Sequence, residues 1–328
     1  MALPITVSNT FQFTCICIAF SLRSEHTALH PASQFRERRG GSTLMATLDT
    51  YLYDELTWPE INEAVEARKV ILLPIGSTEQ HGHHLPLDVD NFLARGVCLE
   101  TAKRAPRELL VMPTIPYGYN EHALDFPGTI HVHYDHFIEY CLDVCKSVVH
   151  AGFDRIIIVD GHGSNEHLCE FIARRATLET DGLVASTMWT NLVIDTFEEI
   201  RDSGQGGAAH AGELETSAYL HLDESKVRMD RAADHYGGAA GREGSRFTEV
   251  DLTKGWGPIK LVQWTSSATP TGVSGAATLS TKEKGRRIIN AAADSLLEFV
   301  REFRAMEKGE RIEHRVVVPE LPTLPSAD

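Results

Sequence analysis

The sequence predicts an α/β fold, a three-layer sandwich with a mostly parallel central sheet. Short continuous apolar runs, such as KVILLPI and RIIIVD, are typical of strands that are buried on both faces. Amphipathic helical patterns separate these runs along the chain. This alternation predicts a parallel sheet that helices cover on both faces.

The predicted elements follow one another from about residue 57. WPEINEAVEA predicts a helix, KVILLPI a strand, residues 91–103 a helix and ELLVMPTIP a strand. The next segment, YDHFIEYCLDVCKSVVHAG, has apolar residues at helical spacing: Phe137, Ile138, Cys141, Leu142, Cys145, Val148 and Val149. It therefore predicts a helix that packs one face on the sheet.

The second half continues the alternation. RIIIVD predicts a strand, residues 165–180 a helix and LVASTMW a strand. A further helix is expected to open with His210, Glu213 and Glu215. The last long helix is predicted to begin at a capping box, in which Ser280 accepts from the Glu283 amide while the Glu283 side chain reaches back.

Composition divides the chain into three parts. Residues 1–44 contain ITVSNTFQFTCICIAFSL, which is too short to span a bilayer and lacks the charged start of a secretory signal. We expect residues 1–44 to be a disordered leader or an over-extended start. Residues 45–310 are expected to form a single domain, and residues 311–328 a Pro-rich C-terminal tail.

Charge and cysteine content narrow the class of partner. The formal charge of −15 argues against partners such as nucleic acid or anionic membranes, and favours a small-molecule substrate. Six cysteines without paired spacing indicate reduced thiols in a cytoplasm. Cys141 and Cys145 are expected in the core.

Two loops rich in metal-ligand residues follow two of the predicted strands. GSTEQHGHHLPLDVDN follows KVILLPI, and GHGSNEH follows RIIIVD. Because ligands of open α/β sheets bind at the carboxyl edge, both loops should meet in one crevice. Glu79 and His81 would face the same way in an extended segment, Asp90 would open the next helix, and His162 would arrive from the second loop. Such a set suits zinc, manganese or iron.

A third cluster lies in GAAHAGELETSAYL. Glu213 and Glu215 cannot share a helix face, so at most one is expected in the crevice, and Glu213 is expected to be solvated. The carboxylates, a bridging aspartate and the histidines could hold two divalent metals with a shared hydroxide. A free histidine could then protonate a leaving nitrogen, so the implied chemistry is hydrolysis.

Several other residues have two interpretations. Asn165 could contact substrate or cap the following helix, and Gly128 and Thr129 could contact substrate or form a simple turn. Trp189 could be core or pocket wall. His83, His84 and Asp88 are expected to support the site from outside or to face the surface.

These motifs resemble the creatininase (creatinine amidohydrolase) family over residues 50–305. The segments that carry the resemblance are LPIGSTEQHGHHLPLDVD, FPGTI, VDGHGSNEH, HAGELETS and SGAATLSTKEKG. It implies that residues 45–310 are a creatininase-like catalytic domain that forms homo-oligomers, commonly hexamers. It further implies the following roles: catalytic His210; metal ligands Glu79 and His81 on different ions, Asp90 as the bridge, His162 and Glu215; substrate contact by Trp189.

Two departures from creatininase bear on the substrate. Ser164 stands where creatininase has a metal-binding glutamate, and Gly206 stands where it has one of two pocket tryptophans. The resemblance therefore implies an amidohydrolase that cleaves a C–N bond of a small cyclic amide, lactam or formamide through a metal-bridging hydroxide, with creatinine not favoured. The G-H-G-x-N form is closer to the family's formamidopyrimidine deformylase and mycofactocin-trimming peptidase.

Three alternatives stay open from the sequence. One is a peptidase of the mycofactocin-trimming type. Another is a non-catalytic metal-binding or small-molecule-binding member of the family, which Ser164 leaves possible. The third is a metal-dependent phosphoesterase, which the absence of an Arg/Lys clamp near the motifs disfavours.

Overall fold

A four-stranded parallel sheet forms the centre of the computed structural model, which describes residues 49–237 and 245–314. Its strands, in the order β2-β1-β3-β4, are β1 (Val70–Ile75), β2 (Leu109–Val111), β3 (Arg155–Asp160) and β4 (Leu183–Met188). The leader expected at residues 1–44 and most of the expected tail lie outside the described residues, and the domain boundaries stay a prediction.

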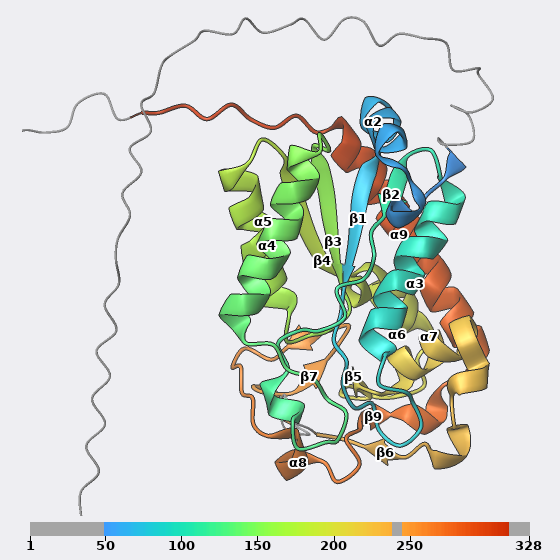
Figure 1. Cartoon of the computed structure of the whole chain (residues 1–328). Helices are drawn as coiled ribbons and strands as arrows, with labels where there is room; N and C mark the ends of the chain where they lie inside the picture. The colour runs from blue at the N-terminus through green and yellow to red at the C-terminus, as the bar shows by residue number, and fades with distance from the viewer. Residues whose placement is uncertain (1–48, 238–244, 315–328) are drawn as a thin grey trace, which may run out of the picture. The chain divides into compact units, whose positions relative to one another are not determined.

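Helices cover both faces of this sheet (Figure 1). The helices α4 (Tyr134–His150) and α5 (Glu166–Glu179) pack on one face, and α3 (Val89–Arg104) and α9 (Lys282–Ala305) on the other. Successive residues of β1 alternate between the two cores, as the pleat requires: Ile71 faces α4 and α5, and Leu72 faces α3 and α9. The predicted three-layer α/β sandwich is confirmed.

Most predicted elements occur close to their expected positions. The first helix is α2 (Trp58–Glu66). The strand expected in ELLVMPTIP shortens to β2, because Pro113 has no N–H to donate to the ladder. Its pairing with β1 resumes only as an isolated bridge between Ile75 and Ile115.

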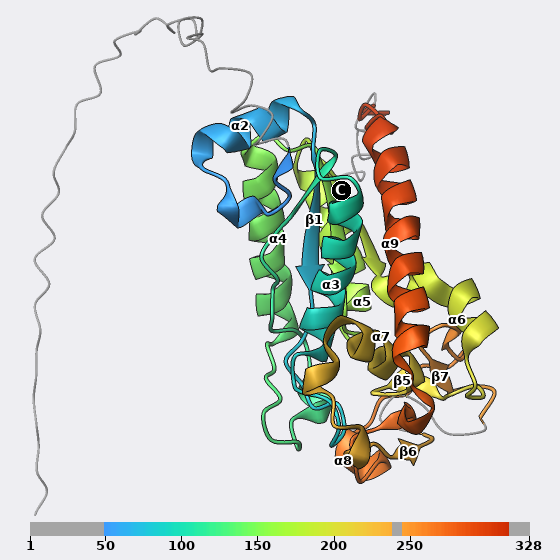
Figure 2. The ribbon, with the colours of Figure 1, turned by 90° about the vertical axis from the view of Figure 1, so that its right-hand side faces the viewer.

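Short antiparallel strands and helices gather beyond the carboxyl ends of the parallel strands (Figure 2). They are β5 (Ala208–His210), β6 (Asp234–His235) and β9 (Ser274–Ala276) in one sheet, β7 (Val250–Asp251) and β8 (Gly255–Trp256) in another, and the helices α6 (Ile194–Ile200), α7 (Glu213–Asp223) and α8 (Thr265–Ala268). His210 therefore ends a strand rather than opening a helix.

The long helix α9 packs tightly on α7. Gly285 makes this possible, since an added Cβ there would lie 1.8 Å from the Ser217 carbonyl oxygen. The predicted capping box is wrong by one residue. Thr281 caps α9 by accepting from the Lys284 amide, whereas the Ser280 hydroxyl donates to the Glu213 carbonyl.

Glu213 is buried, so the prediction that it is solvated is wrong. Its carboxylate accepts from the amides of Asp202 and Ser203 and pairs with Lys284 of α9. Glu213 therefore connects the start of α7 to α9 instead of facing solvent.

The described helices include none with the length and apolar character needed to cross a bilayer.

Lys69 gives the fold a pH-dependent stability. The side chain is buried, its Nζ donates to the carbonyls of Thr50 and Pro106, and burial lowers the pKa of the amine from 10.5 to about 8. Between these two values the unfolded chain binds more protons than the folded one, so the free energy of unfolding should rise with pH.

The expected rise is up to about 1 kcal/mol per pH unit. Urea unfolding between pH 8 and 10 should show it in the wild type and show a smaller slope in Lys69→Met. Lys103→Met, which removes a solvent-exposed lysine, should keep the wild-type slope. Equal slopes in wild type and Lys69→Met would contradict this account.

Candidate metal centre

The two ligand-rich loops meet where the strand order reverses. Strands β1 and β3 are parallel neighbours, and the chain continues from β1 toward one edge of the sheet and from β3 toward the other. Such a switch point leaves a crevice at the carboxyl ends of the two strands. The segment Glu79–His81 enters it after β1, and His162 enters it after β3.

Two glycines bring the start of α3 against the strand ends. A Cβ at Gly161 would lie 2.2 Å from the Asp90 carbonyl oxygen, and one at Gly76 would lie 2.7 Å from the Asn91 amide nitrogen. Only a residue without a side chain permits this approach. The helix therefore delivers Asp90, in its first turn, directly between the two loops.

Asp90 lies at the middle of the cluster. Its Oδ1 is 3.1 Å from His81 Nε2, and its Oδ2 is 3.1 Å from His162 Nδ1. Glu79 Oε1 lies 3.0 Å from the same His162 nitrogen, and Glu215 Oε1 lies 3.9 Å from His81 Nε2. The Asp90 carboxylate thus lies between His81 and His162.

Hydrogen bonds from outside the cluster orient the ligands. His162 Nε2 bonds the Tyr119 carbonyl, and His81 Nδ1 bonds the Glu79 carbonyl, so the other ring nitrogen of each faces the cluster. Asn120 donates to Glu79 Oε2 at 2.6 Å. The Ala211 amide donates to Glu215 Oε2 at 2.6 Å. The other nitrogen or oxygen of each side chain therefore points into the cluster, in Glu79, His81, His162 and Glu215.

Electrostatics favour a cation at this position. Burial opposes charge on His81, but Asp90 and Glu215 outweigh it and raise the pKa of His81 well above its usual range. Glu79 and Asp90 do the same for the pKa of His162. Burial of several carboxylates requires compensating positive charge, which protons on these rings or metal ions can supply.

The donor atoms fit divalent metal ions. Glu79, Asp90 and His162 offer atoms within 4.8 Å of one another, and so do His81, Asp90 and Glu215. Asp90 belongs to both groups. Within the described residues, His81 Nε2 and Asp90 Oδ2 are buried and have ion-pair contacts at 3.1 Å but no hydrogen bond of good geometry, as expected of atoms meant for an ion. Mixed nitrogen and oxygen donors suit zinc, manganese or iron.

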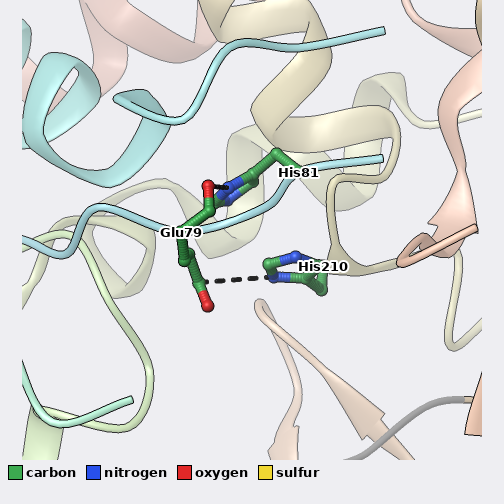
Figure 3. Close-up of side chains that lie close together, drawn as sticks. All are labelled: Glu79, His81 and His210. Atoms are coloured by element: carbon green, nitrogen blue, oxygen red, sulfur yellow. Dashed lines mark hydrogen bonds and ion pairs between the residues drawn. The ribbon is translucent and has the colours of Figure 1, made fainter. Parts of the chain in front are cut away.

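His210 lies beside Glu79 and His81 (Figure 3), and it lines the pocket. Its Nδ1 lies 3.7 Å from Glu79 Oε1, and its ring packs 4.3 Å from the ring of His81. Its Nε2 lies 2.9 Å from both the side-chain amide nitrogen and the main-chain oxygen of Gln80. Gln80 therefore offers a donor to the deprotonated nitrogen and an acceptor to the protonated one, so either tautomer of His210 has a partner.

Glu79, His81 and His210 form a third possible ligand group. This group leaves two roles open for His210, as a ligand or as a proton carrier.

Four residues were expected to touch substrate: Trp189, Asn165, Gly128 and Thr129. The described residues that line the pocket beside the cluster do not include them. Trp189 is fully buried in the core. Asn165 is buried and binds the backbone through its side chain, accepting from the Tyr119 amide and donating to the Gly76 carbonyl, without capping α5. Gly128 has a φ of +94° in a turn, and Thr129 Oγ1 accepts from the Gln80 amide. These residues shape the loops around the site.

Sequence reasoning missed three residues of the site: Gln80, Asn120 and His122. Gln80 lies between Glu79 and His81 in the sequence. An extended segment would turn its side chain away from theirs, so the alternation of side chains does not predict Gln80 as a site residue. Asn120 and His122 come from the loop before FPGTI, and His122 lines the pocket. Burial lowers the pKa of His122 to about 4, so its ring is neutral near pH 7.

The remaining candidates support the site or face away from it. His84 is buried, and its Nε2 shares a hydrogen bond with Thr216 Oγ1 at 2.9 Å. Asp88 accepts from the Tyr219 hydroxyl. His83 is exposed. Ser164 lines the pocket.

Comparisons with known proteins identify the family of this chain. A family model described as creatininase, creatinine amidohydrolase, matches residues 54–300. The 3-dehydro-scyllo-inosose hydrolase of Thermotoga maritima is 28% identical over 264 residues, which cover 76% of this chain and 83% of that protein. The mycofactocin precursor peptide peptidase of Mycobacterium ulcerans is 31% identical over 245 residues, covering 73% and 83%.

Creatininase itself is similar in sequence and in structure. The creatinine amidohydrolase of Pseudomonas putida is 29% identical over 265 residues, covering 76% of this chain and 95% of that protein. A solved manganese creatininase superposes with a TM-score of 0.65 at 26% identity, covering 78% of this chain and 100% of that one. The fold, the ordered motifs and the matched family model lead to one conclusion: the chain belongs to the creatininase family of hydrolases.

Proposed function

We propose that this protein is a metal-dependent amidohydrolase that cleaves a C–N bond of a small cyclic amide, lactam or formamide, with two divalent ions as cofactors. The observation that carries the proposal is the sharing of Asp90 between two buried ligand groups. Zinc, manganese and iron are all compatible with the donors. Creatinine is not favoured, because Trp189 lies in the core and Gly206 replaces the other tryptophan of the creatininase pocket.

The chain's own residues have separate roles in this reaction. Divalent ions at such a centre act as Lewis acids and lower the pKa of water. Glu79, Asp90, His162, His81 and Glu215 would hold them. His210, which is partly accessible from the pocket, delivers a proton from Nδ1 to the leaving nitrogen, and Gln80 keeps its Nε2 partnered before and after the transfer.

Ser164 does not argue for a non-catalytic protein. Glu215 completes the group with His81 and Asp90, so neither ligand group depends on a carboxylate at position 164. The partly accessible His210 beside the cluster also favours an enzyme. A peptidase remains the second candidate, because one relative of 31% identity is named for a precursor peptide.

We further propose a cytoplasmic homo-oligomer. The four cysteines found in the described residues, Cys98, Cys141, Cys145 and Cys169, are buried thiols, as expected in a reducing compartment. An exposed apolar stretch, which includes Ile259, Leu261 and Trp264, favours self-association. Family resemblance suggests a hexamer.

The assembly can be measured directly. Light scattering coupled to size-exclusion chromatography should give a mass several times the chain mass of 36.3 kDa. Replacing Leu261 and Trp264 by serine should shift the protein toward smaller species, because less apolar surface would be buried between subunits. A monomeric wild type at micromolar concentration would rule out the oligomer.

Replacing Asp90 by Asn should remove metal from both ligand groups, since each group uses one of its oxygens. After loading with Zn or Mn, plasma mass spectrometry should find about two ions per wild-type chain and fewer than about one in the variant. Asp88→Asn is the matched control, because Asp88 binds Tyr219 and not the cluster. Full metal content and activity in Asp90→Asn would end the dinuclear proposal.

Replacing His210 by Ala separates its two possible roles. If it carries the proton, the variant should keep its metal while kcat falls by about 10²–10⁴-fold. His83→Ala, which removes an exposed histidine, should leave both values unchanged. Loss of metal from His210→Ala would instead assign His210 to the ligand group with Glu79 and His81.

A further inference from the structure

The pocket outside the metal centre has a mixed wall. Met188, Val250 and Val262 contribute apolar surface, and Thr265 and Thr269 contribute hydroxyl groups. These residues come from the end of β4, from β7 and from the segment around α8. A substrate whose reacting bond lies at the metal centre would therefore extend along this wall.

Apart from histidines, the ionisable side chains on this wall are all carboxylates. The described residues that line the pocket include no lysine and no arginine. Three of its carboxylates belong to the candidate metal centre, and Asp251 is paired with Arg201 at 2.8 Å. Glu166 is the remaining carboxylate of this wall, and it forms no ion pair with the described residues.

Glu166 is held at the edge of the pocket with one oxygen available. It is the first residue of α5. The Asn191 side-chain amide, also on the pocket wall, donates to Oε1 at 3.1 Å. Oε2 has no hydrogen bond to the described part of the chain, and it can accept one from a ligand.

We infer that Glu166 determines substrate charge, so that the enzyme prefers amides carrying a protonated amine or similar cationic nitrogen over amides carrying a phosphate or carboxylate. The inference rests on the amidohydrolase function proposed above. An unpaired carboxylate on a partly enclosed wall attracts a cation and repels an anion more strongly than it would in open water. The net charge of −15 acts in the same direction on approaching substrates.

Three formamides of equal length test the inference, with a common four-carbon chain that ends in an ammonium, a methyl or a carboxylate group. The metal-loaded wild type should have the highest kcat/KM for the ammonium compound and the lowest for the carboxylate. Glu166→Gln should lower the ratio of ammonium to methyl compound about tenfold, because a charged hydrogen bond becomes a neutral one. A role limited to helix stability would leave this ratio unchanged.

Glu170→Gln is the matched control. It makes the same change of charge one turn further along α5, at an exposed residue that pairs with Arg174 and does not line this pocket. It should keep the wild-type ratio. An unchanged ratio in Glu166→Gln, or a wild type that prefers the carboxylate compound, would overturn the inference and leave the amidohydrolase function intact.

Binding distinguishes this failure from a failure of the proposed function. If the metal-loaded enzyme hydrolyses none of the three compounds, ligand-observed NMR with the same compounds still measures the charge preference in wild type and both variants. Selective binding of the ammonium compound that is lost only in Glu166→Gln supports the inference without turnover. Absence of that binding overturns it.

Discussion

The burial of several carboxylates at one switch point of the sheet constrains the rest of the structure. Asp90, Glu79 and Glu215 are each at most 4% exposed, and such groups destabilise a fold unless positive charge compensates them. The histidines, the inward-facing atoms and the outer hydrogen bonds all follow from this requirement. Gly76 and Gly161 serve it as well, because they let α3 carry its aspartate into the gap between two strands.

The sequence predicts the layers, and it predicts that the candidate ligands lie close together, because both follow from local patterns. Continuous apolar strands such as β1 and β3 can only be central, and loops at their carboxyl ends must share one edge. His81 and His162 could therefore be placed together although they are far apart in the chain. An extended segment at 79–81 would need only the alternation of side chains to aim both candidate ligands the same way.

Residues whose environment depends on distant segments were harder to predict. Glu213 is buried because Lys284 arrives from α9, and nothing near Glu213 in the sequence announces that partner. Trp189 joins the core because the chain turns immediately after β4. Asn165 occupies a capping position, yet its side chain binds backbone groups of two other loops. In each case tertiary contacts override a sound local preference.

The candidate metal ligands come from four separate segments: the loop after β1, the start of α3, the loop after β3 and the start of α7. A bound ion would thus act as a cross-link between parts of the chain that are far apart in the sequence. It would close long loops of the unfolded chain and resist the separation of α7 from the sheet. Metal supply during synthesis would then influence how much of the chain completes its fold, in addition to whether the enzyme is active.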